Sequence, residues 1–434
     1  MVHDDGPSGL DVVEVVFDDE RAVSDAGLVL CATLAARLDL GALAAGCVDL
    51  GRRVGAGNVA RKVLSLVMAM LAGADSIDDC QVLRAGRTGR LLGFRPSAPS
   101  TLGTFLRAFT FGHVRQLDRL LGLALERAWA LGAGPGEGRL VVDVDSFIGP
   151  VHGYTKEGAV FGHTRQRGFH PILATRADSG EVLHLRLRKG SANTQRGIDR
   201  FVDELIARVR RAGARGVCLL RADSGFHSQA TFAKLDRAGW QFSIAVRMTQ
   251  AIRAAIEAID EDAWTELDDY PDTGIAQIAE TTAGGRRIVV RRVRTENPDT
   301  QLFATWRHFP IATNRTCPLA VVEAEHRQHA VIEQVIRDLK AQALAHFPSG
   351  RFYANAAWTV IAALAHNLHR QTMLLGAPAE PIRAAQTVAR QLLRLPGRLT
   401  RHARRWTLHL PARWPWRDAF TAALSRLRAL PAPA

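Results

Sequence analysis

Between Arg139 and Val246, residue patterns typical of short strands alternate with patterns typical of helices, and few folds contain this arrangement. Short β-branched and apolar runs bounded by turn residues indicate strands, and apolar residues that recur every three or four positions indicate helices. The region therefore contains strands at 139–145, 168–175 and 182–188, a helix at 194–212, a strand at 217–222, a helix at 228–238 and a strand at 241–246. Because a helical crossover returns the chain parallel to its earlier strand, this order predicts a mixed α/β sheet.

Two of these strands end in carboxylates. Asp143 and Asp145 close the first strand, and Asp223 directly follows the strand at 217–222. A crossover through one helix would lay the two strands side by side and bring their acids to the same edge of the sheet. Residues two apart on a strand share a face, so the pattern alone leaves the choice between Asp143 and Asp145 open.

A third acid is expected from a long helix at 323–346. Polar residues recur along one face of this helix at His326, His329, Glu333, Arg337 and Lys340. The opposite face is apolar and would pack on the sheet, which makes Glu333 the candidate third ligand. Two Asp and one Glu supply the oxygen ligands that Mg²⁺ or Mn²⁺ prefers, and two such ions roughly 3.5–4 Å apart support in-line displacement at a phosphate. Lys340, two turns beyond Glu333, would meet a phosphate.

The residue spacing on the same helix also fits a zinc site. His326, His329 and Glu333 lie three and four positions apart and so share a face, as zinc ligands do. The sequence lacks an H-E-x-x-H pattern, however, so the oxygen-ligand site is the favoured interpretation.

The charge of the chain indicates a polyanionic partner. The formal net charge is +13, and the C-terminal segment from Pro381 onward contains 11 Arg and one acid, a net charge of +10. Tryptophans interleave with these arginines, which favours contact with nucleic acid over a solvated arm. The candidate contacts in this segment are Arg401, Arg404 and Arg405.

The length of 434 residues and a hydrophobic fraction of 47% predict a globular protein of more than one domain. The expected parts are a helical region at 1–138, a core at 139–262, a β-rich insertion at 263–322, completion of the core at 323–376 and a basic helical tail at 377–434. Five scattered cysteines without a C-x-x-C pair argue against a disulfide framework. The longest apolar run, Val63 to Ala72, is too short to span a bilayer, so we expect a cytoplasmic protein without a membrane partner.

Motifs in order along nearly the whole chain resemble those of one family. They are Asp75-Ser76-Ile77-Asp78-Asp79, Ala98-Pro99-Ser100-Thr101-Leu102-Gly103-Thr104, Asp143-Val144-Asp145-Ser146, Lys156-Glu157-Gly158-Ala159, Gly168-Phe169-His170-Pro171, Arg221-Ala222-Asp223-Ser224-Gly225-Phe226 and Ala365-His366-Asn367-Leu368. The sequence resembles bacterial insertion-sequence transposases of the DDE type, specifically the insertion-sequence group numbered thirteen-eighty.

The resemblance implies a ribonuclease H-like core interrupted by the β-rich insertion. It also implies that the helical region at 1–138 is a DNA-binding region for the terminal inverted repeats. It implies Asp145, Asp223 and Glu333 as the catalytic acids, which hold two Mg²⁺ or Mn²⁺ ions. Related transposases carry Tyr and Arg where this sequence has His326 and His329. Arg327 would partly substitute for that Arg, and Arg337 and Lys340 would contact DNA.

The implied partners are double-stranded DNA, as terminal inverted repeats and as target, and a second copy of the chain in a synaptic complex beside the bacterial nucleoid. The implied reaction is hydrolysis at an element end and then attack of the freed 3′-hydroxyl on target DNA. If a hairpin intermediate forms, Trp264 or Trp306 would stack on a base turned out of the duplex, although core packing is the favoured role for either ring.

Two other functions use some of the same residues. A metal-dependent nuclease would need the three acids but no strand transfer, and a non-catalytic DNA-binding protein would need only the basic tail and the helical region. The intact set of acids argues against the binding-only protein. Only the whole-chain resemblance favours a transposase over a nuclease.

Overall fold

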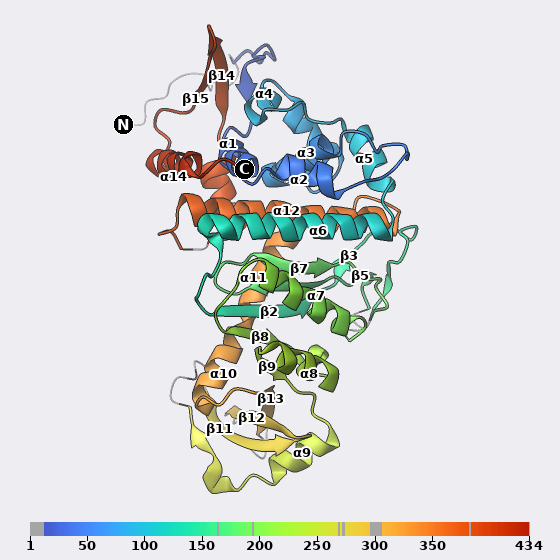
Figure 1. Cartoon of the computed structure of the whole chain (residues 1–434), viewed down its shortest axis with the longest axis vertical. Coiled ribbons are helices and arrows are strands. Elements are labelled where there is room, and N and C mark those ends of the chain that lie inside the picture. The colour runs from blue at the N-terminus through green and yellow to red at the C-terminus, as the bar shows by residue number, and fades with distance from the viewer. Residues whose placement is uncertain are drawn as a thin grey trace, which may run out of the picture.

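The computed structural model of this chain describes residues 13–162, 165–192, 195–267, 270, 274–295, 306–381 and 383–433. These residues form an elongated body (Figure 1). A helical unit with a projecting β-hairpin occupies one end, a central sheet with its helices lies in the middle, and further β-structure forms the other end.

The helical unit is built mainly from the N-terminal part of the chain. Its helices are α1 (Leu28–Arg37), α2 (Leu40–Cys47), α3 (Val59–Ala72), α4 (Thr88–Leu92), α5 (Pro99–Arg107) and α6 (Phe111–Ala128). Pro99 suits the first turn of α5, where its missing N–H has no helical acceptor to lose. Gly73, with φ of 104°, ends α3 in the left-handed conformation that glycine adopts most readily.

The central sheet is mixed, in agreement with the predicted strand order. Its strands lie in the order β10-β11-β12-β13-β9-β8-β2-β6-β7. Their bounds in the core are β2 (Leu140–Ser146), β6 (Ile172–Arg176), β7 (Val182–Arg186), β8 (Cys218–Ala222) and β9 (Gln241–Ala245). Strand β2 pairs in parallel with β8 and antiparallel with β6. The crossovers run through α7 (Ile198–Arg211) and α8 (Gln229–Ala238), so the two acid-bearing strands are neighbours.

The predicted β-rich insertion does not form a sheet of its own. Its strands are β10 (Thr265–Glu266), β11 (Gly274–Ala283), β12 (Arg286–Thr295) and β13 (Arg307–Thr313). Strand β13 pairs antiparallel with β9, so this β-extension (β10 to β13) continues the central sheet. It follows α9 (Gln250–Glu257), and a strand that the sequence also favours at 301–306 falls largely on residues 301–305, outside the described residues.

The predicted helix at 323–346 is two helices with a break. Helix α10 (Leu319–Arg327) leads through a short 3₁₀ turn (Gln328–Ala330) into α11 (Val331–Lys340). The following α12 (Phe352–Gly376) is buried along most of its length and lies beside α6, between the helical unit and the sheet (Figure 1). The Asn367 amide accepts a hydrogen bond from the Val182 N–H (2.7 Å) and donates one to its C=O (2.8 Å), so it satisfies backbone groups of the edge strand β7.

The basic tail is not wholly helical, which corrects the sequence-based expectation. It contains α13 (Ala385–Val388), strands β14 (Gly397–His402) and β15 (Arg405–His409), and α14 (Arg417–Ala429). The two strands form a hairpin, and β14 also pairs with β1 (Ala22–Val23) from the start of the described chain.

A smaller sheet lies beside the end of β2. It consists of β3 (Gly149–Pro150), β4 (Val160–Phe161) and β5 (Arg167–Phe169).

Within the described ranges, no single helix is long and apolar enough to cross a bilayer, although α1 and α2, bent by 59°, would pass together by length and composition.

Candidate active site

Asp145 and Asp223 lie at the ends of adjacent parallel strands. Val144 of β2 is in register with Ala222 of β8, so the next residue of each strand is one of these acids. The Ser146 N–H donates to the Asp145 carboxylate (2.6 Å), and the Gly225 N–H donates to that of Asp223 (3.0 Å). Backbone N–H groups thus hold one oxygen of each acid at the end of its strand.

Asp145 lies within electrostatic range of two other acids, Asp223 and Glu333. Burial is the main cause that raises the pKa of half-buried Asp145 to about 6, and the negative charges of Asp223 and Glu333 contribute to the rise. Glu333 reaches this point from the first turn of α11, on the exposed face of that helix. Neighbouring carboxylates repel one another, so this position favours a bound cation.

Asp143 occupies a different environment from Asp145. Its side chain is fully buried, and its two oxygens accept hydrogen bonds from Nε (2.7 Å) and Nη2 (2.8 Å) of Arg221. His329 Nδ1 lies 3.0 Å from the same carboxylate. Arg221 also donates to the carbonyl oxygens of Glu325 and Gln328. This buried network therefore joins β2 and β8 to the chain that leads into α11.

Arg221 has a role that the sequence interpretation missed. It belongs to a conspicuous motif, but only Asp223 of that motif was given a function. The available signal was a charged side chain in the middle of an apolar strand, because a buried guanidinium requires a buried partner.

The two histidines that favoured zinc take part in this positioning network. His326 Nδ1 lies 2.8 Å from the Ser243 hydroxyl, and burial lowers the pKa of His326 to about 3, so its ring is neutral. His329 is bound to Asp143 and stacks on His326 with ring centroids 6.3 Å apart. Among the described residues, the one compact group of possible metal ligands contains neither His326 nor His329, which argues against these residues as zinc ligands.

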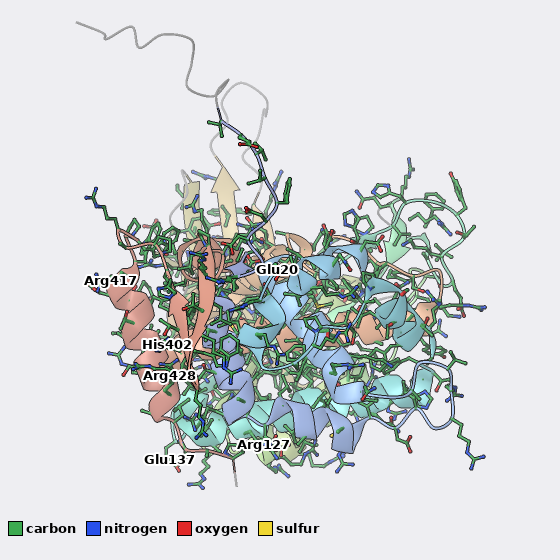
Figure 2. All side chains as sticks on the ribbon, turned by 90° about the horizontal axis from the view of Figure 1, so that it is seen from above. Glu20, Arg127, Glu137, His402, Arg417 and Arg428 are labelled. Atoms are coloured by element: carbon green, nitrogen blue, oxygen red, sulfur yellow. The ribbon has the colours of Figure 1, made fainter. Side chains whose placement is uncertain are left out.

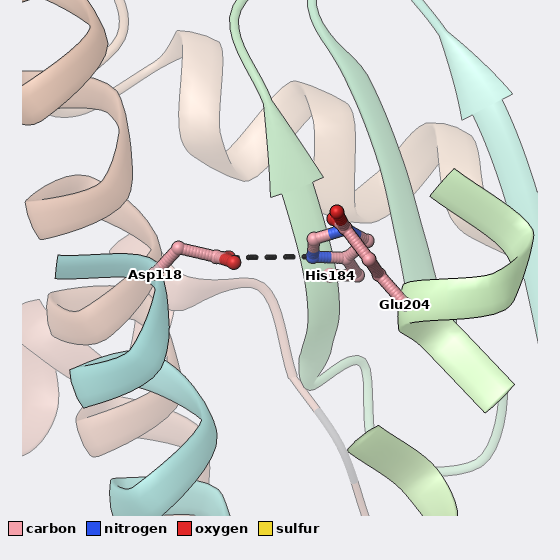
Figure 3. A group of neighbouring side chains, drawn as sticks. All are labelled: Asp118, His184 and Glu204. Atoms are coloured by element: carbon pink, nitrogen blue, oxygen red, sulfur yellow. Dashed lines mark hydrogen bonds and ion pairs between the residues drawn. The ribbon is translucent and has the colours of Figure 1, made fainter. Parts of the chain in front are cut away.

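A tighter group of metal-type side chains lies on the other face of the sheet. Among the described residues, one group has ligand atoms that all lie within 4.8 Å of one another, namely Asp118, His184 and Glu204 (Figure 3). They come from α6, β7 and α7 respectively. Asp145, Asp223 and Glu333 do not form so compact a group.

The compact group is an ion-pair network. Four arginines pair with its two acids, namely Arg115, Arg186, Arg200 and Arg208. Although burial opposes ionisation, the positive groups around Asp118 and Glu204 hold the pKa of each well below its usual range. A cation would meet an excess of positive charge here, so the network serves to join the helical unit to the sheet.

The cations predicted to contact DNA along the acidic helix differ in their surroundings. Arg337 and Lys340 share the exposed face of α11 with Glu333. Arg327 pairs instead with Glu323 (3.0 Å), and its guanidinium lies 5.4 Å from the centre of the Tyr270 ring. Arg327 thus faces the β-extension.

The two tryptophans considered for base stacking are both engaged. The Arg292 guanidinium contacts both rings, 4.1 Å from the centre of Trp264 and 4.4 Å from that of Trp306. Trp264 is buried in the core, which is the role the sequence interpretation favoured.

The remaining predicted DNA contacts lie far from the acids. Arg401, Arg404 and Arg405 are exposed on the hairpin of β14 and β15, which projects from the helical unit at one end of the molecule (Figure 1).

The family model described as transposase DDE domain group 1 matches residues 7–432. Among solved structures, the chain is similar to piggyBac transposase in a cryo-EM synaptic complex with hairpin DNA, at 14% identity and a TM-score of 0.47 over 87% of this chain and 80% of that chain. The search of curated proteins finds no match. Because the family match spans nearly the whole chain, the protein belongs to the DDE transposase domain family, group 1.

Proposed function

We propose that this transposase cleaves DNA at the terminal inverted repeats of an insertion sequence and joins the freed ends to target DNA. The observation that carries the proposal is the gathering of Asp145, Asp223 and Glu333, in which neighbouring carboxylates help to raise the pKa of Asp145. We take Asp145 as the first acid, because both oxygens of Asp143 are bound by Arg221.

The donor set fits hard divalent cations. It consists of carboxylate oxygens that repel one another, and Mg²⁺ or Mn²⁺ would relieve this repulsion. Asp145, Asp223 and Glu333 would hold two such ions. When bound, the ions supply Lewis acidity that activates water or a 3′-hydroxyl and stabilises the leaving oxygen at phosphorus.

The protein's own groups have three tasks in this proposal. Arg337 and Lys340, on the same face of α11 as Glu333, bind DNA phosphates beside the acids. The network of Asp143, Arg221 and His329 fixes the two strands against the chain that carries Glu333. These positioning residues do not themselves contact the DNA.

We propose double-stranded DNA as the substrate and a homodimer as the active form. The net charge of +13 favours a polyanion, and two element ends must be brought together before either joins a target. The site of action would be the bacterial cytoplasm, at the nucleoid.

A metal-dependent nuclease is the alternative that shares this site. The test incubates the purified chain and Mg²⁺ with a target plasmid and a duplex that carries the inverted repeat bordering its own gene. Joined products would support the transposase function. Cleavage without joining would support the nuclease function instead.

Isosteric variants test the assignment of the acids. Asp145→Asn, Asp223→Asn and Glu333→Gln should each abolish cleavage while DNA binding persists. Glu266→Gln, an exposed acid on β10, is the matched control and should remain active. Activity that survives at any of the three acids refutes its assignment.

A further inference from the structure

The hairpin of β14 and β15 has two chemically different faces. Leu399 and Leu408 are in register and point to one side, where they pack with Val23, Ala26 and Leu91 of the helical unit. This apolar face fixes the hairpin to the body of the protein.

The opposite face is polar and cationic. Pairing of Arg398 with His409, Thr400 with Thr407 and His402 with Arg405 places these six side chains together. All of them are exposed except the half-buried Thr400. The two-residue turn adds Arg404, and Ala403 there adopts φ of 52°, as a tight hairpin turn requires. Arg398 on this face pairs with Asp19 (3.4 Å), so the remaining arginines, Arg404 and Arg405, concentrate positive charge at the tip, where it favours a polyanionic partner.

The hairpin is held rigidly at its base. Strand β14 pairs with β1, and the Arg87 guanidinium donates to the Leu399 carbonyl (2.8 Å). The same guanidinium lies 5.6 Å from the centre of the Trp406 ring. The tip therefore projects from a fixed platform, above α14 in Figure 1, and Figure 2 shows His402 of the hairpin with Arg417 and Arg428 of that helix.

We propose that the outward face of this hairpin enters the major groove of the terminal inverted repeat, where Arg404 and Arg405 contact base edges. The inference rests on the proposed function and assigns sequence recognition to a named element. A two-stranded ribbon fits the major groove, about 12 Å wide, and arginine pairs with guanine through two hydrogen bonds. Threonine and histidine side chains on the same face supply further contacts to bases and phosphates.

The position of the hairpin predicts which base pairs it contacts. It lies at the opposite end of the molecule from the β-extension, and strands β2 and β8, whose ends carry Asp145 and Asp223, lie between them (Figure 1). A duplex whose end is at the acids would therefore meet the hairpin at positions inside the element, away from the cleaved end.

Equilibrium binding without divalent ions tests this inference apart from catalysis. The full-length chain is titrated against the inverted repeat that borders its gene and against a duplex of the same composition with shuffled sequence. We expect Arg404→Ala/Arg405→Ala to lower affinity for the repeat at least tenfold, with a loss below about threefold for the shuffled duplex, because base contacts are worth roughly 5–150-fold each. Arg417→Ala/Arg428→Ala removes the same charge from α14 and should keep the preference for the repeat.

The outcomes separate this inference from the proposed function. Equal losses on both duplexes would show that the hairpin arginines contact only phosphates, and an unchanged preference would show that the hairpin does not read sequence. Either result overturns the inference but leaves cleavage untouched. A wild-type chain that binds neither duplex would refute the DNA function itself.

Discussion

The crowding of carboxylates around Asp145 should destabilise the metal-free protein, and Asp145→Asn should relieve this. Burial and the neighbouring acids raise the pKa of Asp145 from its ordinary value of 3.8 to about 6. The folded state therefore prefers the protonated carboxyl. The stability that this preference contributes is present below about pH 4 and is lost as the pH rises through about 6. The amide of the variant is uncharged at every pH in this range, so the variant does not lose this stability as the pH rises.

The size of the effect follows from the two pKa values. At ~1.36 kcal/mol for each tenfold change in proton affinity, the free energy of unfolding of the variant should exceed that of the wild type by about 3 kcal/mol above pH 7. The same relation predicts a gap of about 1–2 kcal/mol near pH 5 and below about 1 kcal/mol near pH 4. The variant should nevertheless be inactive, because it lacks the charge that the proposed ions require.

Urea unfolding across this pH range, in EDTA, measures the gap. Adding Mg²⁺ should narrow it, since an ion bound to the folded wild type stabilises that state by mass action. The control is Glu137→Gln, an exposed acid paired with Arg215, for which we expect less than about 0.5 kcal/mol at any pH. A variant less stable than the wild type near pH 7, or a gap that does not change with pH, would refute the reasoning.

Two further predictions concern buried ion pairs. Asp143→Asn should lower the free energy of unfolding by about 3–5 kcal/mol, because the buried Arg221 guanidinium loses its counter-charge. Urea unfolding tests this, and a loss below about 1 kcal/mol contradicts the pairing. At the ion-pair network of Asp118, His184 and Glu204 we expect no metal site, so added Zn²⁺ should shift the thermal midpoint equally in wild type and His184→Gln. A shift that is lost in the variant would reveal bound metal.

Much of the core follows from local patterns. The alternation of apolar runs and helical periodicity predicted that β2 and β8 would be parallel neighbours, because a helical crossover returns the chain to the sheet in one sense. The three- and four-residue spacing likewise predicted that Glu333, Arg337 and Lys340 would share an exposed helix face. These features depend on residues close together in the sequence.

Other features depend on pairings that local spacing does not encode. The β-extension joins the central sheet because β13 pairs with the edge of β9, across a long intervening segment. The tail forms a hairpin, rather than the expected helices alone, because its apolar face packs on Val23 and Ala26 near the other end of the chain. Strand propensity is decided by such packing more than by composition.

The sequence by itself determined that acids end two neighbouring strands and that a third acid lies on a helix, because strand and helix periods follow from local residue order. It left Asp143 and Asp145 equivalent, since residues two apart share a strand face. Only the tertiary structure decided between their environments. Arg221, 78 positions away, binds both oxygens of Asp143, whereas Asp145 lies beside Asp223 and Glu333. Register and packing between distant segments decide which of two adjacent carboxylates is buried in an ion pair.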